Sequence, residues 1–103
     1  MKTKKRESGL SLLTFIADYF KILSEPLRLK ILVVLRDGEK SVGQIVKEVG
    51  SSQPNVSRHL SILVRAGLVN RRQKKNIAYC SIADKRVWQL CHMGSVPPEK
   101  EAV

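Results

Sequence analysis

Apolar residues recur every three or four positions over much of this chain, and that spacing predicts amphipathic helices. The predicted helices cover residues 10–23, 24–36, 41–49, 52–66 and 85–93. The first of them carries more apolar surface than a small domain needs from its first element, so a partner helix could use the excess. The second is apolar nearly all round, which is typical of a helix at the centre of a core.

The third and fourth predicted helices are adjacent and joined by a tight turn. Ser41 and Gln44 form a capping box at the start of the third helix, and Gly50 ends it. Ser52 caps the fourth helix, which has one apolar stripe and an opposite face of polar and basic residues. The pair predicts a helix-turn-helix whose second helix packs on one side and is free to bind a partner on the other.

A period of two replaces the helical period after residue 67. Residues 77–82 alternate between two faces, as a β-strand does, and Cys80 shares its face with apolar neighbours. A strand starting at Leu68 precedes them, and polar residues 73–76 form the turn between the two. The sequence therefore predicts a mainly α fold with a small β-hairpin: a winged helix-turn-helix with about five helices and a two-stranded wing.

Length and composition favour one domain with a modest core. The chain has 103 residues, of which 43% are hydrophobic, and this content excludes a disordered protein. We expect a flexible basic tail at 1–9, a DNA-binding and dimerisation domain at 10–93 and a flexible tail at 94–103. No apolar run approaches the roughly 18 residues that span a bilayer, and no secretory signal is evident. We therefore expect a cytoplasmic protein without a membrane partner.

Charge is distributed unevenly along the chain, whose net charge is +10. No acidic residue lies between Glu48 and Asp84. The basic residues of that interval are Arg58, Arg65, Arg71, Arg72, Lys74 and Lys75. A basic run is often only a solvated face, but here it coincides with the helix-turn-helix and the hairpin, so we expect the partner to be a polyanion.

Three segments resemble the ArsR/SmtB family of bacterial transcriptional regulators. They are LSEPLRLKIL (23–32), SVGQIVKEVGSSQPNVSRHLSILVRAGLV (41–69) and IAYCSI (77–82). The resemblance extends over most of the chain, roughly from residue 11 to residue 93. It implies a homodimer, held together by the first and last helices, that represses a promoter until an effector releases it.

The side-chain types on the fourth helix suit double-stranded DNA. Gln53 and Asn55 can make paired hydrogen bonds to adenine, and Arg58 can do so to guanine. Ser57 suits a phosphate or a weak base contact that does not discriminate between bases. On the wing, we expect contacts with the backbone or a minor groove from Arg71, Arg72, Lys74, Lys75 and Asn76. His59 neighbours the apolar stripe of the helix, which favours a structural role.

The metal sites known in the family have no counterpart in this sequence. Residues 41–45 contain no cysteine where the arsenic-type site has two, and Arg86 stands where the zinc-type site, beginning at Asp84, has a histidine. No metal or other cofactor is therefore predicted. The candidate effector thiols are Cys91, either buried in the dimer face or functional, and Cys80, which suits a small buried position. A soft-metal or redox effector, and a regulator without an effector, both stay open.

Other classes of function fit the sequence less well. An enzyme is not expected, because no phosphate-binding glycine loop, metal-hydrolase motif or catalytic triad is evident. A winged helix that binds a protein would favour exposed aromatic anchors, and the fourth helix has none. Sequence alone does not separate an activator from a repressor, although repression by occluding a promoter is the simpler mechanism.

Overall fold

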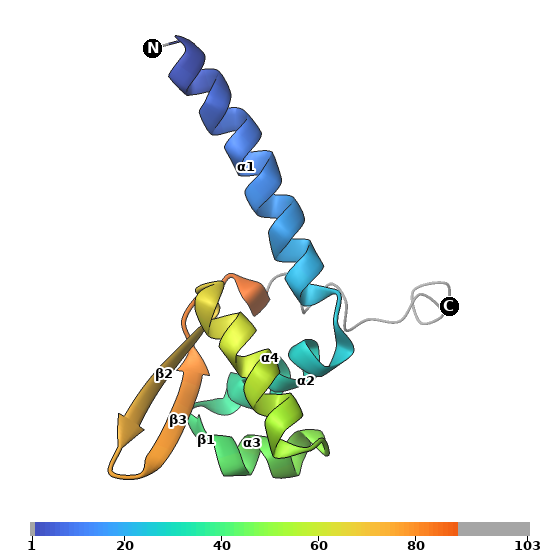
Figure 1. Cartoon of the computed structure of the whole chain (residues 1–103), viewed down its shortest axis with the longest axis vertical. Helices are drawn as coiled ribbons and strands as arrows, with labels where there is room; N and C mark the ends of the chain where they lie inside the picture. The colour runs from blue at the N-terminus through green and yellow to red at the C-terminus, as the bar shows by residue number, and fades with distance from the viewer. Residues whose placement is uncertain (1, 89–103) are drawn as a thin grey trace.

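The computed structural model describes residues 2–88, with side chains from residue 11 onward. The elements are α1 (Lys2–Leu23), α2 (Pro26–Val34), the short 3-10 helix η1 (Leu35–Asp37), β1 (Lys40–Ser41), α3 (Val42–Val49), α4 (Gln53–Arg65), β2 (Val69–Lys74) and β3 (Ile77–Ile82). The strands form one antiparallel sheet in the order β1-β3-β2 (Figure 1). Within the described residues, none of the helices has the length and apolar character that crossing a bilayer requires.

Local capping explains the ends of the helix-turn-helix. The Gln44 amide donates to the Ser41 hydroxyl at 3.1 Å, while the Ser41 amide donates to the Gln44 side chain at 2.9 Å. Gly50 then adopts a left-handed φ of 70° and turns the chain towards α4. The Asn55 amide donates to the hydroxyl of Ser52, which caps α4. The predicted capping box and caps of α3 and α4 are confirmed.

The core lies where α2 meets α3, α4 and the sheet. Ile31 and Leu32 of α2 are fully buried, which confirms the prediction of a central helix. The apolar stripe of α4 packs on the same cluster through Val56, Leu60 and Leu63. Because one whole side of α4 is occupied in this way, its opposite side must face outward.

The start of α2 differs from the prediction. Glu25, and not Ser24, is the N-cap, and its carboxylate accepts from the Leu27 amide at 3.4 Å. The Ser24 hydroxyl instead donates to the Lys21 carbonyl and closes the last turn of α1. Pro26 explains the shift, because a proline disfavours helical geometry in the residue before it, and Glu25 is extended.

The wing differs from the prediction in its strands and its turn. A third strand, β1, pairs Lys40 with Cys80 and Ser41 with Tyr79, so the sheet is larger than the expected two-stranded hairpin. Strand β2 continues to Lys74, which shortens the expected turn 73–76 to residues 75–76. A two-residue strand carries too little alternation to be recognised from its own sequence.

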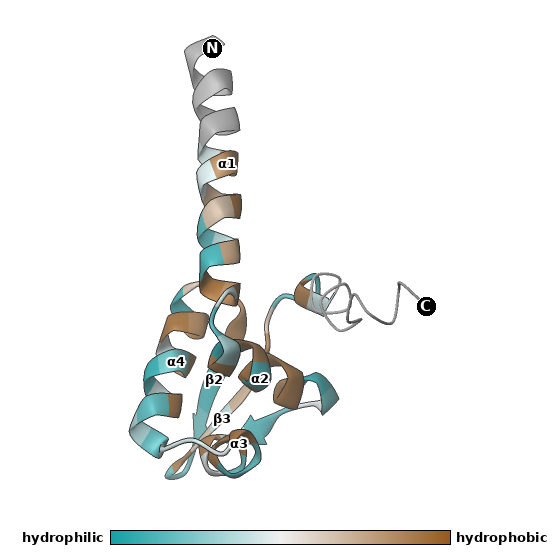
Figure 2. Cartoon of the chain, turned by 90° about the vertical axis from the view of Figure 1, so that its right-hand side faces the viewer, coloured by the Kyte–Doolittle hydropathy of each residue, from teal (hydrophilic) through white to brown (hydrophobic). Residues whose placement is uncertain are grey.

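Only the last turns of helix α1 lie against the other elements, and its N-terminal part projects away from them (Figure 1). It begins at Lys2 and not at the predicted Leu10, because the lysines, arginine and glutamate ahead of that point are good helix formers. Tyr19, Ile22 and Leu23 pack against the core. Apolar residues nevertheless continue along α1 beyond this contact (Figure 2).

Helical geometry begins again at residues 87–88, near the start of the last predicted helix. The Asp84 carboxylate accepts from the Arg86 amide at 3.0 Å, as expected of a residue that caps this segment. The remainder of the predicted helix 85–93, including Cys91, and the predicted tail 94–103 lie outside the described residues.

Candidate nucleic-acid interface

The outward face of α4 carries the four side chains predicted to contact DNA. Gln53 and Arg58 are exposed, and Asn55 and Ser57 are half-buried. The side-chain amide nitrogen of Asn55 donates to the Ser51 hydroxyl at 3.0 Å, and the side-chain oxygen of Asn55 accepts from Arg58 at 2.7 Å. The side chain of Asn55 is therefore hydrogen-bonded to Ser51 and to Arg58. Among the described residues, the side chain of Gln53 makes no such hydrogen bond, so it is available for a partner.

A hollow of about 470 Å³ lies between the N-terminal part of α4 and the wing. It is lined by Ser41, Val42, Gly43, Gln53, Ser57, Arg71, Gln73, Asn76, Ile77 and Ala78. None of these residues is acidic, and all of the polar ones have side chains that can donate hydrogen bonds. The hollow thus joins two predicted contact surfaces, α4 and the wing, into one continuous face that suits an anionic partner.

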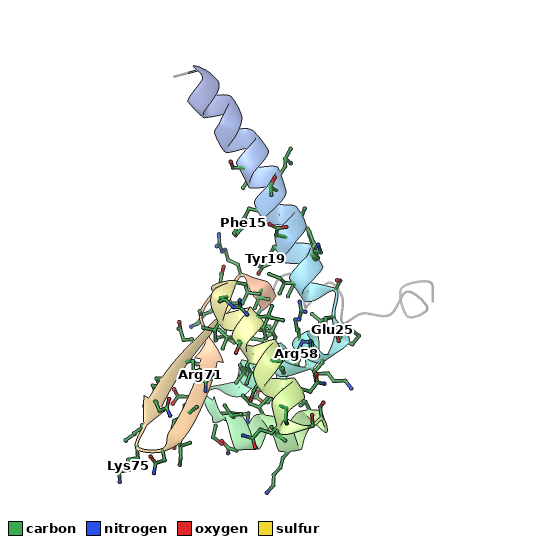
Figure 3. All side chains as sticks on the ribbon, viewed as in Figure 1. Phe15, Tyr19, Glu25, Arg58, Arg71 and Lys75 are labelled. Carbon is green, nitrogen blue, oxygen red and sulfur yellow. The ribbon has the colours of Figure 1, made fainter. Side chains whose placement is uncertain are left out.

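Strand alternation sends the two neighbouring arginines of β2 to opposite faces of the sheet. Arg71 pairs across the sheet with Cys80 and lines the hollow, and Figure 3 shows it on the wing. Arg72 pairs with Tyr79, and its guanidinium lies 5.0 Å from the centre of that ring. It also donates two hydrogen bonds to Glu39, at 2.6 and 2.7 Å.

The ion pair between Arg72 and Glu39 changes the role expected of Arg72. Hydrogen bonds from Arg72 lower the pKa of the Glu39 carboxyl, and the same bonds raise the pKa of Arg72. Both groups are therefore charged at neutral pH. Of the two arginines predicted to contact DNA from this strand, the structure leaves Arg71 open to the hollow and pairs Arg72 with Glu39, in the loop before β1.

The tip of the wing is basic and exposed. Lys74, Lys75 and Asn76 are all exposed, and Lys75 lies at the far end of the hairpin in Figure 3. Lys75 has a left-handed φ of 56°, which the two-residue turn requires. The tip thus extends the basic face well away from α4.

The family model described as "Bacterial regulatory protein, arsR family" matches residues 25–71, which span α2, α3, α4 and the start of β2. The chain belongs to the ArsR family. It is 44% identical over 75 residues to the "Probable mercury resistance operon repressor" of Streptomyces lividans, an alignment that covers 72% of this chain. The chain spans 59% of the length of that repressor.

Solved structures of winged helix-turn-helix regulators have the same fold as this ArsR-family chain. NolR from Sinorhizobium fredii superposes with a TM-score of 0.78 at 30% identity, covering 85% of this chain and 88% of NolR. A homodimeric winged helix-turn-helix DNA-binding domain from Mycobacterium bovis superposes with a TM-score of 0.73 at 32% identity. The superposition covers 82% of this chain and 78% of the Mycobacterium bovis chain. The predicted fold class and family are confirmed.

Six residues of the hollow are not among the predicted contacts, and the two polar ones are Gln73 and Ser41. Gln73 lies two positions beyond Arg71 on the same face of β2, so strand alternation is a signal that could have identified it. Ser41 carries no such signal, because it reaches the hollow through the pairing of β1 with β3, opposite Tyr79.

Metal ligands are sparse in the described part of this ArsR-family chain. No three histidine, cysteine or acidic side chains group there in a way that could hold an ion. At the position of the family's zinc-type site, Arg86 donates to both oxygens of Asp84, at 3.0 and 2.9 Å. These hydrogen bonds lower the pKa of the Asp84 carboxyl.

Cys80 is fully buried on the core side of β3. Burial raises the pKa of its thiol, although the charge of Arg71 acts in the opposite direction. Since the thiolate is the reactive form, a buried thiol of raised pKa is a poor target for oxidants and soft metals. Cys80 therefore acts as a small apolar core residue.

His59 of α4 is buried, with 5% of its surface exposed. Its Nδ1 accepts a hydrogen bond from Nε of Arg28 at 3.1 Å. Burial, and then the charges of Arg58 and Arg28, hold the pKa of the imidazole below its usual value of 6.5, and Glu25 acts in the opposite direction. The ring is therefore neutral at physiological pH and has the structural role expected from the sequence.

We expect the free energy of unfolding to decrease as the pH falls below about 6.5. Above that pH the ring is neutral in both the folded and the unfolded chain. Below it the unfolded chain binds a proton first, because the folded pKa is lower, and the loss continues until the folded pKa is passed. Urea unfolding at about pH 7.5 and about pH 5.5, at one protein concentration, measures the difference.

Two substitutions assign this pH dependence. His59→Phe removes the buried titrating group, so the difference in unfolding free energy between the two pH values should shrink. His92→Gln removes the other histidine of the chain and should leave most of the difference in place. An unchanged pH dependence in His59→Phe would show that His59 is not the group responsible.

Proposed function

We propose that this chain is a homodimeric, sequence-specific regulator of transcription that represses a promoter by binding a twofold-symmetric site on double-stranded DNA. The observation that carries the proposal is the continuous face formed by α4, the hollow and the wing, which holds basic and hydrogen-bonding side chains and no acidic residue among those lining the hollow. Membership of the ArsR family supports it. Such a protein acts where the chromosome lies, in the cytoplasm.

In this proposal α4 enters the major groove, and the wing tip reaches a neighbouring minor groove or backbone. Arg58 contacts guanine and Gln53 contacts adenine, because these side chains match the edges of those bases. Asn55 orients Arg58 through their 2.7 Å hydrogen bond and adds an adenine contact where its own bond to Ser51 is exchanged. Lys74, Lys75 and Asn76 supply contacts that do not depend on sequence.

The hollow takes the sugar-phosphate backbone that runs between the major-groove and minor-groove contacts. Arg71 supplies the positive charge, and Ser57 from α4 supplies a hydroxyl donor. Arg72 faces the other side of the sheet and holds the wing to Glu39, so it stabilises the shape of the surface and makes no phosphate contact.

A second copy of the chain covers the apolar face of α1. The exposed large apolar residues of that helix are Leu12, Leu13, Phe15, Ile16 and Phe20, which is more than a monomer ordinarily leaves in water along one element. Phe15 and Tyr19 lie one turn apart, with ring centroids at 6.2 Å (Figure 3). We place the partner on α1 and, from the family resemblance, on the last helix.

A protein-binding winged helix is the competing function, and the exposed chemistry disfavours it. Protein interfaces concentrate aromatic anchors, and the outward face of α4 carries glutamine, asparagine, serine and arginine instead. On the wing, Tyr79 is half-buried and stacked under Arg72. The surface thus supports nucleic acid over an acidic protein.

Fluorescence anisotropy tests the proposed function directly. A labelled duplex from upstream of the protein's own gene is titrated near physiological salt with an excess of unlabelled random duplex. Retained binding, with protected half-sites about one helical turn apart, supports a dimeric sequence-specific regulator. Complete loss of binding to the random competitor would mean that charge alone is recognised. A reporter that falls when the gene is deleted would contradict repression.

Arg58→Ala should weaken operator binding by about 1–3 kcal/mol while binding to random duplex changes little. The reason is that a base contact contributes only at the correct sequence. Lys74→Ala is the matched comparison, because a phosphate contact is lost equally on every sequence. The two affinities are measured by anisotropy at one salt concentration. Equal losses on operator and random duplex for Arg58→Ala would overturn its assignment.

Arg71→Ala and Arg72→Ala should differ in the salt dependence of DNA binding. Loss of a phosphate contact lowers the slope of log affinity against log salt by about 1 per subunit, which we expect for Arg71→Ala. Arg72→Ala should leave the slope unchanged, since its guanidinium is paired with Glu39. If Arg72→Ala lowered the slope as much as Arg71→Ala, the assignment of the two faces of β2 would be wrong.

Phe15→Glu should convert the dimer to a monomer, because it places a charge in the proposed apolar interface. Thr14→Glu introduces the same charge at an exposed position on the opposite side of α1 and should leave the dimer intact. Sedimentation velocity at micromolar concentration gives the two masses. An unchanged mass for Phe15→Glu would exclude α1 from the interface.

The proposed release acts through Cys91, because Cys80 is buried with a raised thiol pKa. The name of the Streptomyces relative, a mercury resistance operon repressor, makes mercury(II) the probe to try first. We expect mercury(II) to weaken operator binding in the wild type and in Cys80→Ala, and to have no effect in Cys91→Ser. An unchanged response in Cys91→Ser would exclude Cys91 as the route of release. No response in the wild type would favour a regulator without this effector.

A further inference from the structure

Two arginines from different helices flank the imidazole of His59. Arg28 of α2 places its Nε 3.1 Å from Nδ1, and Arg58 of α4 places a guanidinium nitrogen 3.4 Å from Nε2. Figure 3 shows Arg58 beside the start of α2, where Glu25 lies. The ring thus sits between the guanidinium of the half-buried Arg28 and one that belongs to the candidate DNA-binding face.

A neutral imidazole offers only one acceptor nitrogen, and the other nitrogen carries the proton. The Nε–H of Arg28 has no acceptor capacity, so its hydrogen bond makes Nδ1 the acceptor. Nε2 of His59 must then carry the proton. Two donors face each other across the 3.4 Å between Nε2 and Arg58, and that contact is not a hydrogen bond.

The tautomer of His59 determines where Arg58 finds an acceptor. With Nε2 protonated, the guanidinium of Arg58 bonds instead to the Asn55 oxygen at 2.7 Å and stays exposed. If Nδ1 carried the proton, Nε2 would accept from Arg58 and draw the guanidinium onto the buried ring. The two arginines therefore compete for a single acceptor lone pair.

We propose that Arg28 is a positioning residue for sequence recognition: by occupying the acceptor of His59, it keeps the guanidinium of Arg58 on the outward face of α4. Arg28 touches no DNA in this arrangement. Its effect on recognition rests on the proposed function of Arg58, whereas its effect on the His59 tautomer does not.

Helix α1 takes part in the same arrangement. A second nitrogen of the Arg28 guanidinium donates to the Ile22 carbonyl, in the last turn of α1, at 3.2 Å. The end of α1 therefore helps to fix the orientation in which Nε of Arg28 meets His59. A shift of that turn would alter the competition for the ring, so the packing of α1 is linked to the side chain that contacts the base.

NMR of the His59 ring nitrogens tests the assignment without DNA. Near pH 8, about 1.5 units above the usual histidine pKa, the wild type should show the tautomer with a proton on Nε2 and a bare Nδ1. In Arg28→Met the population should move towards the Nδ1-protonated tautomer. Arg36→Met, the same change at an exposed arginine of η1, should leave the ring unchanged.

Either of two NMR results would overturn the proposal. One is a wild-type ring protonated on Nδ1, an observation that requires no variant to fold. The other is an unchanged ring in an Arg28→Met protein whose amide spectrum shows it folded.

DNA binding tests the consequence for recognition. Arg28→Met should lower the ratio of operator to random-duplex affinity by roughly tenfold, since one good base contact discriminates by about that factor or more. Affinity for random duplex should stay unchanged. In an Arg58→Ala background, Arg28→Met should cause no further loss of discrimination, because the side chain it positions is absent. Additive losses would overturn the proposed route through Arg58.

The two measurements separate failure of this inference from failure of the proposed function. A protein that shows the expected ring tautomers but no preference for an operator would keep the competition at His59 and refute recognition by Arg58. A protein that prefers its operator equally with and without Arg28 would keep the proposed function and refute the positioning role.

Discussion

The burial of one side of α4 against α2 is the constraint on which the remaining structure depends. Val56, Leu60 and Leu63 join Ile31 and Leu32 in a continuous apolar cluster. This packing removes the apolar stripe of α4 from water, so its polar side is turned outward. The direction of that outward side then decides which residues of the turn and the wing lie beside it.

Carboxylates are few in this chain, and their placement shapes the basic face. Within the described residues the ion pairs join Lys40 to Glu48, Arg72 to Glu39, and Arg86 to Asp84. None of these three carboxylates is among the residues that line the hollow. The positive potential between α4 and the wing is thus not cancelled locally, and that potential attracts a polyanion before any specific contact forms.

The outer part of α1 exposes large apolar side chains to solvent, whereas its last turns are packed against the core. Its last turns are held by Leu23 in the core and by the hydrogen bond from Arg28 to the Ile22 carbonyl. Phe15 is more than half exposed two turns earlier on the same helix. The same helix therefore contacts Arg28 at its last turn and carries, further out, the apolar surface that we assign to the second subunit.

Short-range physics let the sequence by itself determine much of this protein. The capping box at Ser41, the glycine at position 50 and the alternation after Leu68 act within a few residues, so the helix-turn-helix, the hairpin and the outward side of α4 were all predictable. Strand alternation could also have separated Arg71 from Arg72, although the sequence analysis grouped them as equivalent contacts.

Only the tertiary structure decided which of these side chains are free to bind. Glu39 and Arg72 are 33 residues apart, and Arg28 and His59 are 31 apart. No local pattern encodes such pairs, because they arise from the way the elements pack on one core. Packing therefore engages Arg72, fixes the tautomer of His59 and leaves Arg58 and Arg71 facing outward.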